Sequence, residues 1–232
     1  MQPKSEFDEY SENYEEALAK GISVSGESKD FFASHRVKWL HQRLNRHGGT
    51  TRRILDFGCG TGSSTPYLCS TLNPEILVGC DPSEASLEVA RREFSKNFPA
   101  HFITNSGIAQ HGPYNLAFCN GVFHHIPPAE RPECIRQIHA NLQPGGIFAF
   151  WENNPLNPGT RYVMSKIPFD RDAITLMPWE AKNLLRQGNF EILETTFQFI
   201  FPRSLSFMRV TEPAMCRLPL GAQYLVLARR SG

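Results

Sequence analysis

The run Ile54–Gly62 (ILDFGCGTG) limits the possible folds more than any other part of this chain. It joins an apolar strand, which reaches the acidic residue Asp56, to a turn with glycine at alternate positions: Gly58, Gly60 and Gly62. Glycine lets the backbone approach a ligand where a Cβ atom would clash. The following residues 63–66 (SSTP) predict the start of a helix, because Ser and Thr are good helix caps. The run therefore predicts a strand–turn–helix unit with a nucleotide-type ligand at the turn.

The spacing of the glycines distinguishes between classes of cofactor. A dinucleotide-binding turn has the pattern G-x-G-x-x-G, whose third glycine lets the helix pack closely against the strand. In this chain Ser63 stands at that third position, and Asp56 precedes the first glycine by two residues. A P-loop would need a Lys after the glycines, and none follows. The pattern argues against both ligand classes, while a glycine-rich turn of another α/β protein remains an alternative.

A second acidic residue, Asp81, follows the apolar run Ile76–Cys80. It lies about 20 residues after the glycine turn, as expected of an acid at the end of the second strand of a βαβ unit. A carboxylate there can accept hydrogen bonds from both hydroxyls of a ribose. Ser83 and Glu84 then suit a helix start, through capping and the helix dipole. The alternative is that Asp81 merely caps that helix, but its distance from the glycine turn favours ribose binding.

Strands and helices alternate through the first two thirds of the chain. Strands are predicted at 53–57, 76–80, 101–104, 115–119 and 147–151, and helices at 63–72, 83–96 and 128–142. This alternation is typical of a parallel sheet covered on both faces, with ligands beyond the carboxyl ends of the strands. Gln143–Gly146 predict a turn before the fifth strand. The flanking elements are helices at 5–20, 28–46 and 179–187, strands at 190–200 and 222–229, and an irregular stretch at 201–221.

The chain resembles the class I S-adenosylmethionine-dependent methyltransferases. Its glycine turn with Asp56 is similar to their motif I, and Val122–Pro127 (VFHHIP) is similar to the segment after their fourth strand in small-molecule enzymes. The resemblance covers nearly the whole chain, and Asn154–Arg161 looks like a bacterial small-molecule subgroup. It implies an α/β fold with a Rossmann-like, doubly wound, seven-stranded sheet whose last strand is antiparallel. It also implies a helical flank or lid over 1–49 and a methyltransferase domain over 50–232, with a substrate cover within 150–221.

The resemblance further implies S-adenosyl-L-methionine as the cofactor. The glycine turn would hold the amino-acid end of the cofactor, and Asp81 would hold its ribose. Related enzymes commonly place an acid near the adenine after the third strand, where this chain has Asn105 and Ser106. The predicted cofactor-binding residues are Asp56, Gly58, Cys59, Gly60, Gly62, Asp81, Pro82, Asn105, Ser106, Asn120 and Gly121.

Three candidate catalytic residues follow the fourth and fifth strands: His124, His125 and Glu152. An imidazole titrates near neutral pH, so it can take a proton from an acceptor hydroxyl or orient that hydroxyl. Neighbouring residues on an extended segment point in opposite directions, so we expect only one histidine to face the active site. The alternative is that the histidines hydrogen-bond loop carbonyls. A base is needed only if the acceptor is a hydroxyl or a protonated amine.

Polar residues after the fifth strand are candidates for binding the acceptor: Asn153, Asn154 and Arg161. Amides can pair with hydroxyls, and a guanidinium can pair with a carboxylate or a phosphate. Asn also favours turns through its own side chain, so a purely structural role is equally open. An anionic acceptor is favoured by the arginines of the cover region: Arg161, Arg203, Arg209 and Arg217.

Composition argues against several other kinds of partner. The formal charge is +1, with 24 basic and 23 acidic residues, which gives no electrostatic reason to expect a nucleic acid or an anionic membrane. No apolar run is long enough to span a membrane, and the N-terminus does not resemble a secretion signal. The six cysteines form no C-x-x-C pair and no zinc-binding spacing with His, so we predict no metal site and a cytoplasmic location. The oligomeric state, monomer or homodimer, stays open.

These features predict methyl transfer from S-adenosylmethionine to a small polar acceptor, with oxygen favoured as the methylated atom. A second hypothesis keeps the cofactor site but gives the protein a regulatory or non-methylating role, because a fold does not fix a function. A third hypothesis, a nicotinamide-dependent oxidoreductase, disagrees with Asp56 and Ser63 in the glycine turn.

Overall fold

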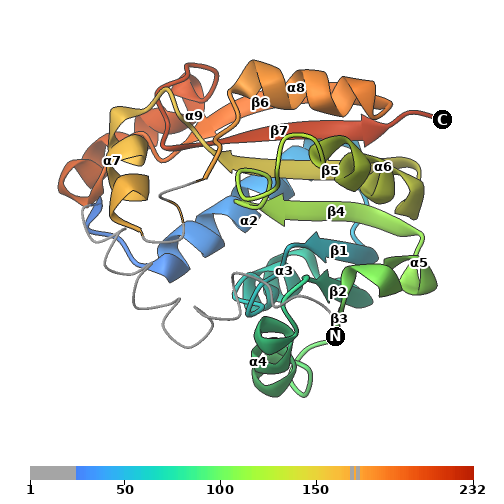
Figure 1. The fold of residues 1–232 in the computed structure, drawn as a ribbon. Helices are drawn as coiled ribbons and strands as arrows, with labels where there is room; N and C mark the ends of the chain where they lie inside the picture. Colours follow the sequence, from blue (N-terminus) through green and yellow to red (C-terminus); the bar gives the residue numbers. More distant parts are fainter. Residues whose placement is uncertain (1–24, 168–169, 171–172) are drawn as a thin grey trace.

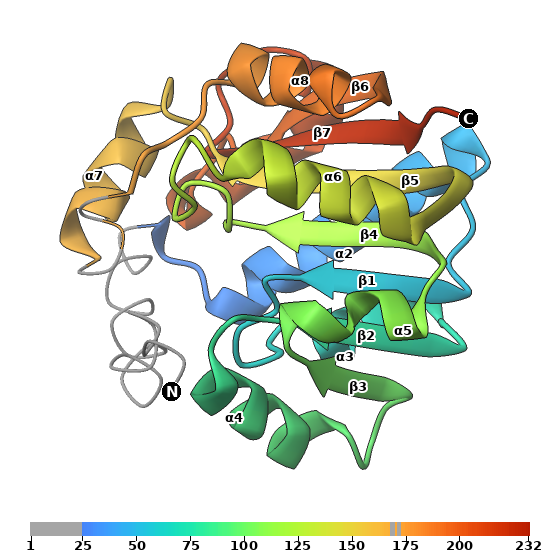
Figure 2. The same ribbon diagram turned by 45° about the vertical axis from the view of Figure 1, so that its right-hand side comes forward.

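The computed structural model describes residues 25–167, 170 and 173–232, and its centre is a seven-stranded sheet (Figures 1 and 2). The strands are β1 (Arg53–Phe57), β2 (Ile76–Cys80), β3 (Ala100–Ile103), β4 (Tyr114–Asn120), β5 (Leu142–Asn153), β6 (Phe190–Gln198) and β7 (Gln223–Arg230). Their order is β3-β2-β1-β4-β5-β7-β6, and β7 runs antiparallel to both of its neighbours. The other strand pairs are parallel. The predicted fold, with its antiparallel last strand, is confirmed.

Helices cover both faces of the sheet (Figure 2). One face is packed by α2 (Lys29–His47), α3 (Thr65–Leu72) and α4 (Glu84–Phe94), and the other by α5 (Ile108–His111), α6 (Arg131–Asn141) and α8 (Pro178–Gln187). Alternation along β1 explains the two hydrophobic cores, because Ile54 belongs to one cluster and Leu55 to the other. Both side chains are fully buried, as expected of a parallel sheet covered on both sides.

Helix α2 confirms the helix predicted at 28–46, and its ends carry suitable caps. The Ser28 hydroxyl accepts a hydrogen bond from the backbone N–H of Phe31 (3.1 Å), and Gly48 ends the helix with φ of 69°. On the buried face of the helix, the indole N–H of Trp39 donates to the Thr196 hydroxyl on β6 (3.0 Å). This contact ties α2 to the sheet. The helix predicted at 5–20 lies outside the described residues.

Strand β5 is longer than predicted, because it begins at Leu142 rather than near residue 147. Leu142 pairs with Tyr114 on β4, and the next pair is Ile147 with Leu116. Residues 143–146 of β5 therefore lie opposite the single residue Asn115 of β4, which makes them a bulge within the strand. The backbone does turn within the bulge, where Gly145 has φ of 76°, but the strand already begins before it, at Leu142.

The region predicted to contain a substrate cover, residues 150–221, has more helix than predicted. Besides the predicted helix α8, its described residues form α7 (Pro158–Lys166), the 3-10 helix η5 (Arg203–Thr211) and α9 (Glu212–Met215). Asn157 caps α7 by accepting a hydrogen bond from the backbone N–H of Thr160 (3.0 Å), and Pro158 takes the first helical position. The expectation of an irregular stretch at 201–221 was wrong, because η5 and α9 fill most of it. Figure 1 shows α7 and α9 at the end of the sheet toward which β4 points, where the parallel strands end.

All six cysteines are free thiols, and only Cys134 is partly exposed. Burial raises the pKa of the thiols of Cys59, Cys80 and Cys119, so these groups stay protonated and act as small apolar core side chains. None of the helices in the described part of the chain is long and apolar enough to cross a membrane.

Candidate active site

The glycine turn lies at the carboxyl end of β1. Gly58, Gly60 and Gly62 have φ of 72°, 52° and 78°, a region that favours glycine. A Cβ atom on Gly58 would lie 2.4 Å from Cγ2 of Val122, whereas one on Gly60 would meet nothing within 4 Å. The turn is therefore tightly packed at Gly58 and open at Gly60, where a ligand can lie against the backbone.

The Asp81 carboxylate joins the glycine turn to the start of α4. Its Oδ2 accepts a hydrogen bond from the Gly60 N–H and its Oδ1 accepts one from the Ser83 N–H, both at 2.9 Å. Helix α4 is capped by Ser83, whose hydroxyl accepts from the Ser86 N–H (3.2 Å), so Asp81 is not itself the cap. A carboxylate has about four acceptor sites. These two contacts are therefore compatible with ribose hydroxyls at the same group.

Asp56 is a buried acid directly before the glycine turn, with 2 % of its surface exposed. Its Oδ2 accepts no hydrogen bond from the described residues. Burial, and then the nearby charge of Asp81, raise the pKa of Asp56 from 3.8 to about 7. Burying an unpaired carboxylate is costly. A cationic ligand group beside Asp56 would therefore be bound favourably.

Two amide oxygens near the strand ends also lack partners. Oδ1 of Asn105, which begins the 3-10 helix η3 (Asn105–Gly107) after β3, is buried without a hydrogen bond among the described residues. The same holds for Oδ1 of Asn120 at the end of β4. The neighbouring Ser106 hydroxyl lies 3.0 Å from the hydroxyl of Thr104. Each buried amide oxygen can accept a hydrogen bond from a ligand N–H or O–H.

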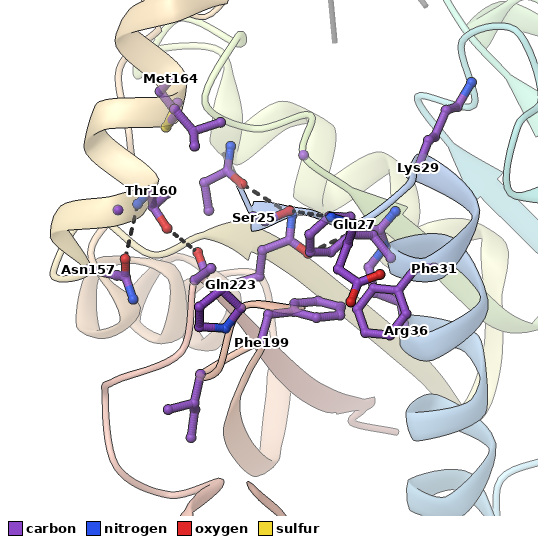
Figure 3. Close-up of a pocket in the computed structure, with 18 of the residues that line it drawn as sticks. Ser25, Glu27, Lys29, Phe31, Arg36, Asn157, Thr160, Met164, Phe199 and Gln223 are labelled. Atoms are coloured by element: carbon purple, nitrogen blue, oxygen red, sulfur yellow. Dashed lines mark hydrogen bonds between the residues drawn. The ribbon is translucent and has the colours of Figure 1, made fainter. Parts of the chain in front are cut away.

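A pocket of about 430 Å³ lies beside the ends of β4 and β5 (Figure 3). Helices α2 and α7 form opposite walls, as the blue and yellow ribbons of Figure 3 show. Apolar side chains line much of it, among them Phe31, Phe32, Val163, Met164 and Phe199. Polar side chains at the strand ends include Asn120, His124, Asn153 and Gln223. Such a lining suits a small molecule with both an apolar and a polar part.

A chain of polar contacts runs from α2 to β5 along this pocket. Arg36 Nη1 donates to Oε1 of Gln223 (3.0 Å), and Gln223 Nε2 donates to Oδ1 of Asn153 (3.1 Å). Arg36 is 8 % exposed, and its positive charge opposes the rise in the pKa of Asp56. The guanidinium therefore lies close to the glycine turn as well as to the pocket, and it supplies a buried positive charge there.

His124 lies between two carboxylates at the rim of β4 and β5. Its Nδ1 is 2.6 Å from Oε2 of Glu152, and its Nε2 is 3.5 Å from Oδ1 of Asp170. The other oxygen of Glu152 accepts from the Phe123 N–H (2.7 Å), which fixes the carboxylate. Burial lowers the pKa of His124, but the charges of Glu152 and Asp170 outweigh it and raise that pKa to about 10. The ring is thus held in one orientation, with His124 and Asp170 both lining the pocket.

The two histidines do not point in opposite directions, contrary to expectation. Their ring centroids are 4.1 Å apart, and Nε2 of His125 lies 3.3 Å from the same Asp170 oxygen. The cause is a turn, in which the His125 N–H donates to the carbonyl of Val122 (3.0 Å). Side chains alternate only on extended backbone. Both imidazoles therefore converge on Asp170.

The three residues predicted to bind the acceptor are placed differently from one another. Asn153 lines the pocket. Asn154 is fully buried, and its amide nitrogen donates to two carbonyls of residues 219–221 (3.1 and 2.7 Å), which is the structural role left open for it. Arg161 is exposed and does not line the pocket. Among the arginines of the cover region, Arg209 lines it.

Thr160, Asp170 and Gln223 lie in segments that resemble the bacterial subgroup, but sequence reasoning gave them no role in the site, although all three line the pocket. The contacts that place Asp170 and Gln223 join segments far apart in the chain, so no local pattern marks them. For Thr160 a signal existed, because the Asn157–Pro158 pair is a typical helix start and predicts α7.

Comparisons with known proteins agree with this geometry. A family model described as a methyltransferase domain matches residues 54–146. The chain is 28 % identical over 186 residues to a carboxy-S-adenosyl-L-methionine synthase of Desulfotalea psychrophila. The aligned region covers 68 % of this chain and 76 % of that protein.

A trans-aconitate 2-methyltransferase of Rhodopseudomonas palustris is 28 % identical to this chain over 131 residues. The aligned region covers 55 % of this chain and 46 % of that protein. The chain thus matches less than half the length of this second relative. Among solved structures, an S-adenosylmethionine-dependent methyltransferase of Clostridium acetobutylicum has the same fold, with a TM-score of 0.66 and 14 % identity over 97 % of this chain and 99 % of that one.

Proposed function

The chain belongs to the class I S-adenosylmethionine-dependent methyltransferases, and from this premise we propose that it methylates a carboxylate oxygen of a small acceptor. The observation that carries the proposal is the buried guanidinium of Arg36 in the pocket beside the glycine turn. A guanidinium binds a carboxylate through paired, charge-assisted hydrogen bonds. The name of the Rhodopseudomonas palustris relative also describes methylation of a carboxylic acid.

We assign the cofactor to the open side of the glycine turn. The ammonium group of S-adenosylmethionine would lie beside Asp56, whose unpaired oxygen needs a cationic partner. The ribose hydroxyls would donate to Asp81, and the adenine amino group would donate to the buried Oδ1 of Asn105. In this placement the reactive methyl group faces the end of β4, where Asn120 and Gly121 line the pocket.

The acceptor would combine a carboxylate with an apolar body. Its carboxylate would lie near Arg36, and its apolar part would contact the aromatic wall at Phe31 and Phe199. Arg209 adds a second positive charge at the pocket, although it is paired with Glu27 at 2.9 Å. We expect Arg36 to determine acceptor affinity, because its guanidinium contacts Gln223 and, through it, Asn153 at the strand ends.

Methyl transfer to a carboxylate mainly requires the protein to align the acceptor oxygen with the methyl group of the cofactor. A carboxylate is ionised at neutral pH, so its oxygen can attack the methyl carbon without a base. The O–C bond forms as the C–S bond breaks, and the electron pair of the broken bond remains on sulfur in S-adenosylhomocysteine. Holding the two reactants in line and excluding water can supply much of the acceleration. Asn120, at the end of β4, would position the acceptor by a hydrogen bond.

The proposal is tested with S-adenosylmethionine labelled in its methyl group and a panel of small carboxylic acids. Each acid is paired with its amide and with an alcohol of similar shape, and products are identified by mass spectrometry. We expect label in a methyl ester for at least one acid and none in the matched amide. Transfer only to alcohols, amines or carbon atoms would refute the carboxylate proposal while leaving the family assignment intact.

A matched pair of variants tests the role of Arg36. Arg36→Gln should raise the KM for the acid roughly tenfold or more, because a hydrogen bond to a charged group is lost. Arg161→Gln removes the same charge from an exposed position outside the pocket and should leave KM unchanged. Equal effects of the two substitutions would contradict the assignment of the acceptor site.

A second candidate function is a reaction on the cofactor itself. The Desulfotalea psychrophila relative, which this chain matches over 76 % of its length, is named as a synthase of carboxy-S-adenosylmethionine. The same mass measurement decides between them, because that reaction would give S-adenosylmethionine bearing an additional carboxyl group. Tight binding of S-adenosylhomocysteine with neither product would favour a regulatory role instead.

A further inference from the structure

We propose that His124, His125 and Asp170 form a binding site for a divalent transition-metal ion, of which Zn²⁺ is the probe chosen here. One ligand atom from each of the three side chains lies within 4.8 Å of the others. Imidazole nitrogen and carboxylate oxygen are the donors that such ions commonly take in proteins. The metal site itself does not depend on the proposed function.

The spacing of the donor atoms fits a shared ion. Oδ1 of Asp170 lies 3.5 Å from Nε2 of His124 and 3.3 Å from Nε2 of His125. Two ligand atoms that are each about 2.05 Å from a zinc ion, at the tetrahedral angle, are about 3.3 Å apart. An ion could therefore enter between the three atoms with small movements of the side chains.

Glu152 supplies the outer contact that metal-binding histidines usually have. Its Oε2 lies 2.6 Å from Nδ1 of His124 and holds a proton on that nitrogen, so a metal ion would bind at Nε2 in place of the proton there. The second oxygen of Glu152 accepts from the Phe123 N–H at 2.7 Å, which fixes the carboxylate in turn. The ring of His124 therefore has the orientation that metal binding needs before any ion is bound.

Backbone contacts hold the two ligand segments together. The Ile174 N–H donates to the carbonyl of His124 (2.9 Å), which joins the segment after Asp170 to the histidine turn. Arg131 donates from Nε to the carbonyl of Ile126 (2.9 Å) and from Nη2 to the carbonyl of Ile174 (2.6 Å). These contacts do not use the three ligand side chains, and they hold the two ligand segments at a fixed spacing.

Charge and access also favour a cation at this place. The carboxyl groups of Glu152 and Asp170 are buried beside the two imidazoles, and a cation placed there would have oxygen as well as nitrogen ligands. His124 and Asp170 line the acceptor pocket, so an ion with three protein ligands would keep an open position toward it. If the proposed function holds, a carboxylate oxygen of the acceptor would occupy that position.

The test measures metal binding by the full chain without any acceptor. Protein treated with a chelator is titrated with Zn²⁺ by calorimetry and with Co²⁺ by visible absorption. We expect one ion per chain and Co²⁺ bands of a site with nitrogen and oxygen ligands. His125→Ala and Asp170→Asn should weaken binding at least tenfold, and Glu152→Gln should weaken it by roughly 10- to 100-fold.

Two controls distinguish metal binding at this site from binding elsewhere on the protein and from a loss of folding. His101→Ala removes an exposed histidine on the edge strand β3, which β2 and β1 separate from β4, and should leave binding unchanged. Binding of S-adenosylhomocysteine by each variant shows whether it is folded, and it tests the cofactor site independently of the metal. Absence of binding, thiolate-to-cobalt bands that indicate cysteine ligands, or equal binding by His125→Ala and wild type would overturn the proposal.

Discussion

Removing the charge of Asp56 should change how the stability of the protein depends on pH. Folding raises the pKa of this acid from 3.8 to about 7, so the folded state binds the proton more tightly than the unfolded state does. The contribution of this group to the free energy of unfolding is therefore fully present below about pH 4. It falls as the pH rises from about 4 to about 7, and above that it no longer changes with pH. At 1.36 kcal/mol per pKa unit the total loss is about 4 kcal/mol, of which roughly 2.5 kcal/mol falls between pH 5 and pH 8.

The Asp56→Asn variant lacks this titration. At pH 5 the wild-type carboxyl group is protonated, so the variant differs mainly by an unpaired amide N–H, which costs about 1–3 kcal/mol. At pH 8 the variant avoids a buried charge that the wild type must accommodate. The stability of the variant relative to the wild type should therefore improve by roughly 2.5 kcal/mol between pH 5 and pH 8, whatever the fixed cost of the amide.

Thermal unfolding followed by circular dichroism, without cofactor, measures this change. For a chain of this size roughly 2.5 kcal/mol corresponds to a relative shift of about 5–10 °C in Tm. Glu191→Gln, at an exposed carboxyl on β6, serves as the control and should follow the wild-type curve. If the Asp56→Asn curve runs parallel to that of the wild type from pH 5 to pH 8, the assigned pKa is refuted.

Three further predictions concern the cofactor site. S-Adenosylhomocysteine at a hundred times its Kd should stabilise the wild type by about 2.7 kcal/mol, and Asp81→Ala should lose most of this gain in a thermal melt. Affinity for this ligand, measured by calorimetry, should rise roughly 10- to 100-fold from pH 5 to pH 8, because its ammonium group needs ionised Asp56; a flat profile would exclude that pairing. Gly58→Ala should lower the Tm of the ligand-free protein more than Gly60→Ala does, because the new Cβ at position 58 would lie 2.4 Å from Val122. Gly60→Ala should instead reduce the stabilisation by ligand, at a smaller cost to the fold. A larger loss of Tm in Gly60→Ala than in Gly58→Ala would contradict the assignment of Gly60 to the open side of the turn.

The parts of the fold that the sequence predicted are those with a local physical signal. The apolar runs of β1 and β2, the glycines between β1 and α3 and the caps at Ser28 and Ser83 each act within a few residues. The start of β5 at Leu142 was missed because the turn residues 143–146 mask it in the sequence, and only the pairing with Tyr114 on β4 shows it. Helix α7 was missed although Asn157 and Pro158 signal its start.

The candidate site was less predictable, since it depends on contacts between distant segments. Arg36 and Gln223 are separated by 187 positions in the chain, and His124 and Glu152 by 28. Periodicity gives the face of an element on which a residue lies, but not the residue it meets across the fold. The prediction that the protein has no metal site used only spacing along the chain, and that prediction remains to be tested by metal binding.

Strand β7 occupies an interior place in the sheet, between β5 and β6, although it follows both in the chain. During synthesis β6 therefore appears before β7, its one neighbour among the described strands, and the edge of β5 that β7 covers is open from a still earlier point. Open strand edges invite pairing with other chains. Because Ala222 and Gln223 line the pocket, the pocket is also incomplete until this late strand has been inserted. The order of synthesis thus places the completion of both the sheet and the pocket in the same late step.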